Sequence, residues 1–283
     1  MADAPARCAE ACLASGEPML GSAINVDVWL MLEYRLAWHA KATDHNSLPA
    51  STQHWLSATV ERYTALGKKA RVQFIRRPER DHDLTLFVAD RGRLTRLDAT
   101  NYAEFDALDL TLDALETVDE PQYFVCTNAK RDLCCSRLGR PAYARLHALV
   151  GGRAWQTTHT GGHRFAPNVL TLPDARLYGR VFADDVERLV ASIEAGEIAW
   201  DYLRGTTAYP AVAQVAERAA SPGARLLTCE ADCATFELSA DGADAQRQTL
   251  RVGPGEAVYE SPPSCGKPVD QYRPLRVLEV ETT

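Results

Sequence analysis

Apolar runs of strand length alternate with stretches of helical spacing along most of this 283-residue chain. One such run covers residues 26–32, and no run approaches the roughly 18 residues that a membrane-spanning helix needs. A helical stretch at residues 52–66 carries apolar residues at helical spacing and stops at Gly67, a residue type favoured just past a helix end. The alternation predicts a mixed α/β fold without a membrane span.

The composition is that of an ordinary globular protein, with 46% hydrophobic and 24% charged residues. A formal charge of -7 gives no overall attraction for a nucleic-acid backbone or an anionic lipid surface. The first twenty residues lack the basic start and apolar stretch of an export signal, so we expect a cytoplasmic protein. Because cytosolic thiols are kept reduced, the eight cysteines indicate metal or redox chemistry rather than a disulfide framework.

Two consecutive units carry a similar pattern of elements. The first has a helix at 52–66 and strands at 26–32, 71–75, 84–89 and 93–97. The second begins after residues 119–121, with strands at 123–125, 155–158, 168–172 and 177–182 and helices at 141–150 and 184–195. Its order of strand, helix, strand, hairpin and helix is compatible with a thioredoxin-like unit. Residues from about 201 onward add a helix at 211–220 and short strands.

Three cysteines come after the first strand of the second unit. Cys126 stands directly after this strand, and Cys134 and Cys135 stand at the end of a segment that we expect to be a loop before the helix at 141–150. Pro141 suits the first turn of that helix. The thiols are therefore expected at one end of the strand, on a loop.

Two histidines come after the next strand of the same unit. Gly161 and Gly162 separate His159 from His163, and each glycine weakens a helix interior by roughly 1 kcal/mol, so we expect both rings on a loop. Loops that leave the same ends of neighbouring strands can bring two thiolates and two imidazoles together. Four such ligands are enough for one metal centre.

These segments resemble the sucrase/ferredoxin-like family. The resemblance rests on residues 126–135, 159–166, 168–173 and 178–180, and it extends more weakly to residues 16–21 and 264–268. It implies a thioredoxin-like ferredoxin domain with a [2Fe-2S] cluster. We expect an α/β (α+β mixed) fold with a degenerate thioredoxin-like domain at 1–119, the ferredoxin domain at 120–206 and a small C-terminal α+β extension at 207–283.

The resemblance also implies which residues hold the cluster. The family pattern reaches its second cysteine ligand three residues beyond the aspartate, here Asp132, so Cys135 is preferred and Cys134 is the alternative. The implied cofactor and metal ligands are Cys126, Cys135, His159 and His163.

Such a ligand set determines the net charge of the cluster site and how readily it is reduced. Two thiolates cancel the charge of an oxidised, doubly positive [2Fe-2S] core, whereas four would leave the site doubly negative and harder to reduce. Imidazoles can also protonate on the free ring nitrogen, so reduction is expected to depend on pH. Lys130, Arg131 and Arg164 bracket the ligands and either stabilise the reduced site, dock an acidic partner or form a solvated basic rim.

We therefore expect an electron-transfer protein rather than a catalyst with its own substrate, although the sequence leaves enzymatic activity open. Its partner would be a redox protein or a small electron donor or acceptor, and neither nucleic acid nor membrane is expected. A zinc-stabilised binding module is one alternative. A thiol-disulfide oxidoreductase is another, disfavoured because no Cys-x-x-Cys occurs.

The remaining cysteines have no histidine nearby in sequence. Cys8 and Cys12, like Cys229 and Cys233, have the spacing that a helix places on one face, and we interpret both pairs as buried thiols without a ligand role. Cys265 stands alone and is interpreted as structural.

Overall fold

The computed structural model describes residues 7–79, 83–90, 92–108, 116–221, 223–238 and 246–283. Its first half contains β1 (Val28–Glu33), α2 (Ala50–Ala65), β2 (Ala70–Arg76), β3 (Leu84–Asp90), β4 (Arg93–Ala99) and α3 (Tyr102–Asp106). Strand β1 is parallel to β2 and antiparallel to β3, and β3 pairs with β4 in an antiparallel hairpin. The strand order in this half is β4-β3-β1-β2.

The second half repeats this arrangement. It contains β5 (Gln122–Cys126), α4 (Leu133–Val150), β6 (Ala154–Thr157), β7 (Val169–Leu172), β8 (Arg176–Tyr178) and α5 (Val186–Glu194), with the short 3-10 turns η2 (Gly151–Arg153), η3 (His163–Phe165) and η4 (Ala183–Asp185). Strand β5 is parallel to β6 and antiparallel to β7, and β7 is antiparallel to β8. Both halves therefore have the strand order of a thioredoxin-like unit, as predicted.

The two halves join edge to edge in one nine-stranded sheet. Strand β2 pairs antiparallel with β6, and β9 (Leu203–Thr206) extends the sheet beyond β8. The sheet curls, because the Phe87 ring of β3 meets the Phe124 and Trp155 rings of β5 and β6 edge to face, with centroids 5.7 and 5.6 Å apart. One face of each half thus packs against the other half.

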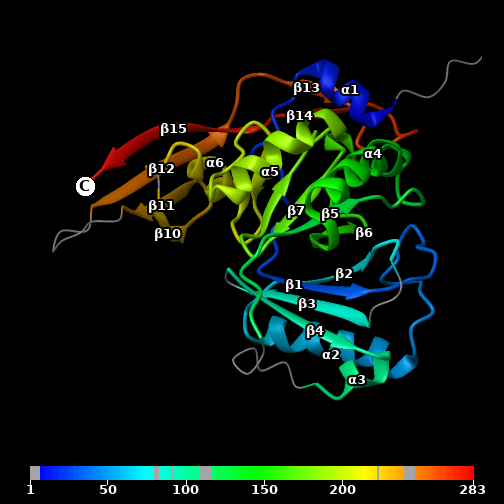
Figure 1. Cartoon of the computed structure of the whole chain (residues 1–283). Helices are drawn as coiled ribbons and strands as arrows, with labels where there is room; N and C mark the ends of the chain where they lie inside the picture. Colours follow the sequence, from blue (N-terminus) through cyan, green and yellow to red (C-terminus); the bar gives the residue numbers. More distant parts are fainter. Residues whose placement is uncertain (1–6, 80–82, 91, 109–115, 222, 239–245) are drawn as a thin grey trace, which may run out of the picture.

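Alternation along the strands explains the resulting layers. In β1, Val28, Leu30 and Leu32 pack under α2, while Trp29 and Met31 point into the core that the two halves share. Every residue of β1 is buried, as expected for a strand covered on both faces, whose sequence is a continuous apolar run. Helices α4 and α5 cover the outer face of the second half (Figure 1).

The C-terminal residues build a separate antiparallel sheet with the order β10-β11-β12-β15. Its elements are α6 (Ala211–Glu217), β10 (Arg225–Cys229), β11 (Cys233–Glu237), β12 (Arg247–Pro254) and β15 (Leu275–Thr282). A second hairpin of β13 (Tyr259–Ser261) and β14 (Asp270–Tyr272) lies beside the N-terminal helix α1 (Cys8–Ser15). Helix α1 and the β13–β14 hairpin therefore lie side by side over the second half (Figure 1).

Two sequence-based expectations were wrong. Helix α4 begins at Leu133, not at residue 141, because the Asp132 side chain caps it by accepting a 2.8 Å hydrogen bond from the Cys134 amide. Pro141 lies inside the helix, where packing of this helix on the sheet overrides its low helix propensity. Cys229 and Cys233, expected to be buried, end one strand and begin the next and are only half-buried.

No helix within the described ranges combines the length and hydropathy needed to cross a membrane. The domain limits at residues 119 and 206 and the cytoplasmic location stay predictions.

Candidate metal centre

The centre forms where two parallel strands end. Cys126 is the last residue of β5, and its register partner on β6 is Thr157, two residues before His159. Because parallel strands place their carboxyl ends at the same edge, the segments after β5 and β6 start next to each other. The sequence prediction of neighbouring strand ends is confirmed.

The second thiol comes from the first turn of α4 rather than from a loop. Cys134 and Cys135 are both buried there. Gly139, one turn further, lets the helix approach β5 closely, since a Cβ at this position would lie 2.3 Å from the Cys126 carbonyl oxygen. The helix start is thereby held against the end of the strand.

The histidine segment turns sharply, as the glycine pair predicts. Gly161 and Gly162 have φ values of 95° and 67°, in the region that disfavours other residues. A Cβ on Gly162 would also lie 2.4 Å from the Arg204 guanidinium. His159 precedes this turn and His163 comes after it, so both rings reach the same side.

The donor atoms of the four predicted ligands converge. The Cys126 and Cys135 sulfurs each lie 3.9 Å from Nδ1 of His159, and the Cys135 sulfur lies 3.7 Å from Nδ1 of His163. The two imidazole rings stack with centroids 3.9 Å apart. Cys126, Cys135 and His163 are buried, whereas His159 is partly exposed and forms the outer side of the centre.

Electrostatics favours the metal-binding forms of two of these groups, Cys126 and His163. A hydrogen bond from the Cys135 thiol and the nearby His159 lower the pKa of Cys126, against the effect of burial, while the same contact with Cys126 raises the pKa of Cys135. Burial and the neighbouring His159 lower the pKa of His163 to about 4. The lowered pKa values of Cys126 and His163 favour the thiolate and the neutral imidazole, which are the forms that bind metals.

The histidine segment is held from both sides by residues that the sequence did not single out. From β9, the buried Arg204 donates hydrogen bonds to the Gly161 carbonyl at 2.9 Å and to Oδ1 of Asn168 at 2.8 Å. From β2, Arg71 and Gln73 each donate to the His159 carbonyl at 3.1 Å. No short motif reveals these residues, because their partners lie on distant elements and most of them are backbone atoms.

The basic residues near the ligands divide into two kinds. Lys130 and Arg131 are exposed. Arg164 is instead tied to the buried Glu17 by hydrogen bonds of 2.8 to 3.1 Å, which connect the segment after α1 to η3. Arg131 also lines a cavity of about 680 Å³ that reaches His159.

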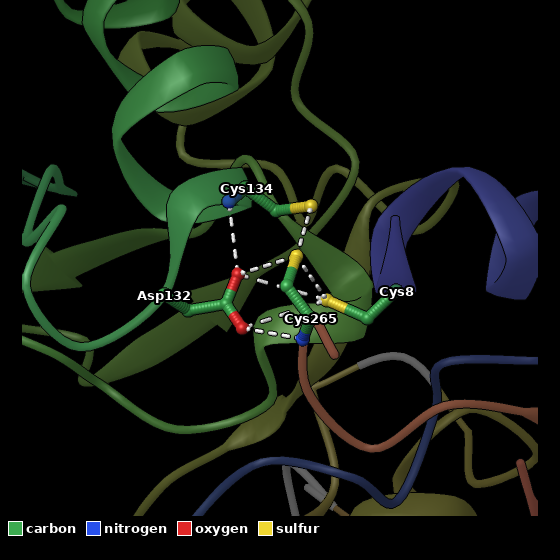
Figure 2. A group of neighbouring side chains, drawn as sticks. All are labelled: Cys8, Asp132, Cys134 and Cys265. Atoms are coloured by element: carbon green, nitrogen blue, oxygen red, sulfur yellow. Dashed lines mark hydrogen bonds between the residues drawn. The ribbon is translucent and has the colours of Figure 1, made fainter. Parts of the chain in front are cut away.

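Cys134 faces away from this centre. Its sulfur lies 3.3 Å from that of Cys265, in a group that also contains Cys8 and Asp132 (Figure 2). The sequence interpretation gave Cys265 as a lone residue and Cys8 as a buried thiol without a ligand role. It therefore missed the contact between these two residues, which lie near opposite ends of the sequence. Each of the eight cysteines is free in the described structure.

Comparisons with known proteins agree with the family resemblance. Residues 19–205 match the family described as sucrase/ferredoxin-like, and this range contains all four donors. The altered inheritance of mitochondria protein 32 of Meyerozyma guilliermondii is 29% identical over 113 residues, or 36% of this chain and 37% of that protein. The chain thus aligns with little more than a third of that relative.

Among solved structures, a thioredoxin-like [2Fe-2S] ferredoxin from Aquifex aeolicus has a TM-score of 0.28 and 18% identity, covering 33% of this chain and 97% of its own. A cysteine-to-serine variant of that ferredoxin has a TM-score of 0.26 and 19% identity, covering 30% of this chain and 97% of its own.

Proposed function

Because the chain belongs to the sucrase/ferredoxin-like family, we propose that it is an electron-transfer protein whose [2Fe-2S] cluster is held by two cysteines and two histidines. The ligands are Cys126, Cys135, His159 and His163. The observation that supports this assignment is the approach of both sulfurs to the imidazole Nδ1 atoms, at 3.7 to 3.9 Å.

The donor set fits an iron-sulfur centre. Thiolate sulfur with two imidazoles is the ligation of Rieske-type clusters, and a cluster bound in this way exchanges one electron at a time. In both histidines the ring nitrogen that faces the sulfurs is Nδ1, so Nδ1 is the proposed ligand atom and Nε2 is not. Cys135 is assigned in preference to Cys134 because its sulfur faces the two rings, whereas the Cys134 sulfur faces Cys265.

The surrounding charges suit a site that becomes negative on reduction. With two thiolates the oxidised centre is neutral, so one added electron makes it an anion. Arg204 lies beneath the histidine segment, and burial lowers its pKa to about 9, so its guanidinium remains charged at neutral pH. The guanidinium of Arg71 lies at the His159 carbonyl. These cations favour the reduced state.

Reduction is coupled to protons through the free ring nitrogens. An added electron would place negative charge beside the imidazoles of His159 and His163 and favour their protonation, so reduction would take up protons over a window of pH. The reduction potential then falls as pH rises through that window, by up to about 59 mV per pH unit for one proton per electron.

A small electron donor or acceptor has a place to bind. The cavity of about 680 Å³ beside His159 is lined by three cationic residues, Lys41, Arg71 and Arg131, and by two acidic ones, Asp44 and Glu61. Arg71 also donates a hydrogen bond to the His159 carbonyl, so positive charge lies next to the outermost ligand. We propose that a small anionic redox partner occupies it, because electrons would then pass through the exposed imidazole rather than through the buried thiolates.

The decisive experiment compares the two adjacent cysteines. The purified protein should contain about two iron atoms and two acid-labile sulfides per chain and show visible charge-transfer absorption. Cys135→Ser should lose or strongly change that absorption, while Cys134→Ser should keep it. A colourless protein with zinc in place of iron would favour the zinc module, and a metal-free protein that reduces disulfides would favour the oxidoreductase.

A redox titration at several pH values tests the histidines. The expected potential is less negative than that of a four-cysteine ferredoxin and falls with rising pH. A potential independent of pH would argue against histidine ligation.

A further inference from the structure

A second group of metal-binding side chains lies beside the first turn of α4. Cys8 comes from α1, Asp132 and Cys134 from the start of α4, and Cys265 from the segment between β13 and β14. Figure 2 shows the three sulfur atoms and the carboxylate of this group facing one another. Cys8 and Cys265 are separated by 257 positions in the sequence, so only the fold brings them together.

Four distances between the donor atoms lie within about 0.5 Å of those between the corners of a tetrahedron around one small ion. The Cys265 sulfur lies 3.6 Å from that of Cys8 and 3.3 Å from that of Cys134. Oδ1 of Asp132 lies 3.2 Å from the Cys265 sulfur and 3.7 Å from the Cys8 sulfur. Tetrahedral zinc, with bonds of about 2.3 Å to sulfur and about 2.0 Å to oxygen, requires separations of about 3.8 Å between sulfurs and about 3.5 Å between sulfur and oxygen.

Other interpretations of the three sulfurs fit less well. A disulfide joins two sulfurs at about 2.05 Å and would leave the third thiol without a partner. Thiolates on different irons of a cluster are kept further apart by the separation between the metals. All four donor atoms here lie within 4.8 Å of one another, which suits a single ion.

The carboxylate is held in place for such a role. Asp132 accepts hydrogen bonds from the Cys134 amide at 2.8 Å, the Cys265 amide at 2.8 Å and the Ser264 hydroxyl at 2.7 Å. A carboxylate offers about four acceptor positions, so one remains for a metal. Cys8 and Cys134 are 0% and 2% exposed, which keeps water away from two of the three sulfurs.

We propose that Cys8, Asp132, Cys134 and Cys265 form a structural site for a single divalent cation of the zinc class. Three thiolates and one carboxylate leave no open position for a substrate, as in closed structural zinc sites. Adjacent helical residues point about 100° apart, so Cys134 binds this ion while Cys135 faces the histidines. The ion ties α1 and the C-terminal segment to the turn that carries Cys135.

The test is the metal content of the purified full-length chain. We expect about one zinc ion per chain in addition to the iron, measured by inductively coupled plasma mass spectrometry. Cys8→Ser and Cys265→Ser should lose the zinc and keep the iron and its visible absorption. The double variant His159→Ala/His163→Ala should lose the iron and keep the zinc, so the failure of one site is distinguishable from the failure of the other.

Cys12→Ser is the matched control, because Cys12 lies on the same helix as Cys8 and is equally buried, at 0% exposure, but outside the group. It should keep both metals. Circular dichroism of each variant shows whether it has folded. A folded, unmodified protein without zinc would overturn the proposal, and so would a disulfide between Cys134 and Cys265. The proposal would also be wrong if the histidine double variant lost the zinc while Cys8→Ser and Cys265→Ser kept it.

Discussion

The two halves of the nine-stranded sheet share one strand order and differ in the residues at the carboxyl ends of their strands. In the second half, β5 ends at Cys126 and the segment after β6 carries His159. In the first half, the corresponding strands end at Glu33 and Arg76, and no cysteine occurs between Cys12 and Cys126. The side chains at the ends of two parallel strands, and not the fold itself, therefore decide which half can bind a metal.

The first half nevertheless contributes to the centre. Strand β2 is the neighbour of β6, and Arg71 and Gln73 on β2 hold the carbonyl of His159. A half without cysteine or histidine at the ends of β1 and β2 thus positions one ligand of the other half. The comparison predicts that only ligand substitutions in the second half remove the metal. Substitutions of residues that position a ligand should weaken metal binding from either half.

Replacing histidine pairs tests the first part of this comparison and has the largest expected effect. His159→Ala/His163→Ala should reduce the bound iron from about two atoms per chain to near zero, because two of four ligands are lost. The loop after β1 also carries two histidines, and His39→Ala/His45→Ala is the control, since both are exposed and their ring centroids lie 6.4 Å apart. Loss of iron from the control would contradict the assignment of the centre to one half.

Arg204→Met should have the next largest effect. The substitution removes the donors to the Gly161 carbonyl, to Oδ1 of the buried Asn168 and to the Ser22 carbonyl, the last at 2.7 Å. We expect the free energy of unfolding to fall by about 3 kcal/mol or more, measured by urea denaturation. Arg188→Met is the control, because Arg188 pairs with Asp201 on the surface and should contribute less than about 1 kcal/mol.

Gln73→Met tests the contribution of the first half. It removes the donor to the His159 carbonyl and the acceptor of the Thr158 hydroxyl, so we expect a loss of about 1 to 3 kcal/mol and faster release of iron to a chelator. Gln246→Met, at an exposed position just before β12, should change stability by less than about 0.5 kcal/mol. Equal rates of iron release in both variants would mean that β2 does not position the histidine.

The sequence predicted the strands better than the start of α4, which carries Cys134 and Cys135. Periodicity and turn residues predicted most strands of the two halves and the glycine turn between the histidines. The strand expected at 177–182 ends at Tyr178, however, and β9 was not predicted. Pro141 suggested a helix start, but Asp132 is the actual cap, and the turn that it begins carries Cys134 and Cys135. An aspartate before a helical run is a recognisable signal, although Pro141 competed with it.

Contacts between distant elements could not be predicted from the sequence. Cys265 and Cys8 meet only because the C-terminal hairpin lies beside α1, and Arg204 reaches Gly161 only because β9 extends the sheet. None of these pairs has a characteristic spacing, so periodicity and motifs carry no information about them.

The two outer edges of the sheet differ as well, and this difference gives the smallest expected effect. Among the described strands, β4 ends the sheet on one side, whereas β8 is extended by β9 and then covered by α6. Glu217 on α6 accepts hydrogen bonds from the Thr206 hydroxyl of β9, at 2.9 and 3.1 Å. Burial raises the pKa of Glu217, although Thr206 and the nearby Arg176 act in the opposite direction.

A carboxyl group with a raised pKa binds its proton more tightly in the folded than in the unfolded protein. Its contribution to stability is therefore complete below the unfolded pKa of about 4.3 and is lost as pH rises through the folded pKa. Glu217→Gln imitates the protonated form, so the variant should have a higher urea midpoint than the parent near pH 7 and the same midpoint near pH 4. Glu256→Gln, whose side chain is 87% exposed, should show no such difference. A parent more stable than Glu217→Gln at neutral pH would mean that Arg176 and Thr206 outweigh burial, and that this edge of the sheet is held by a charge rather than by a neutral hydrogen bond.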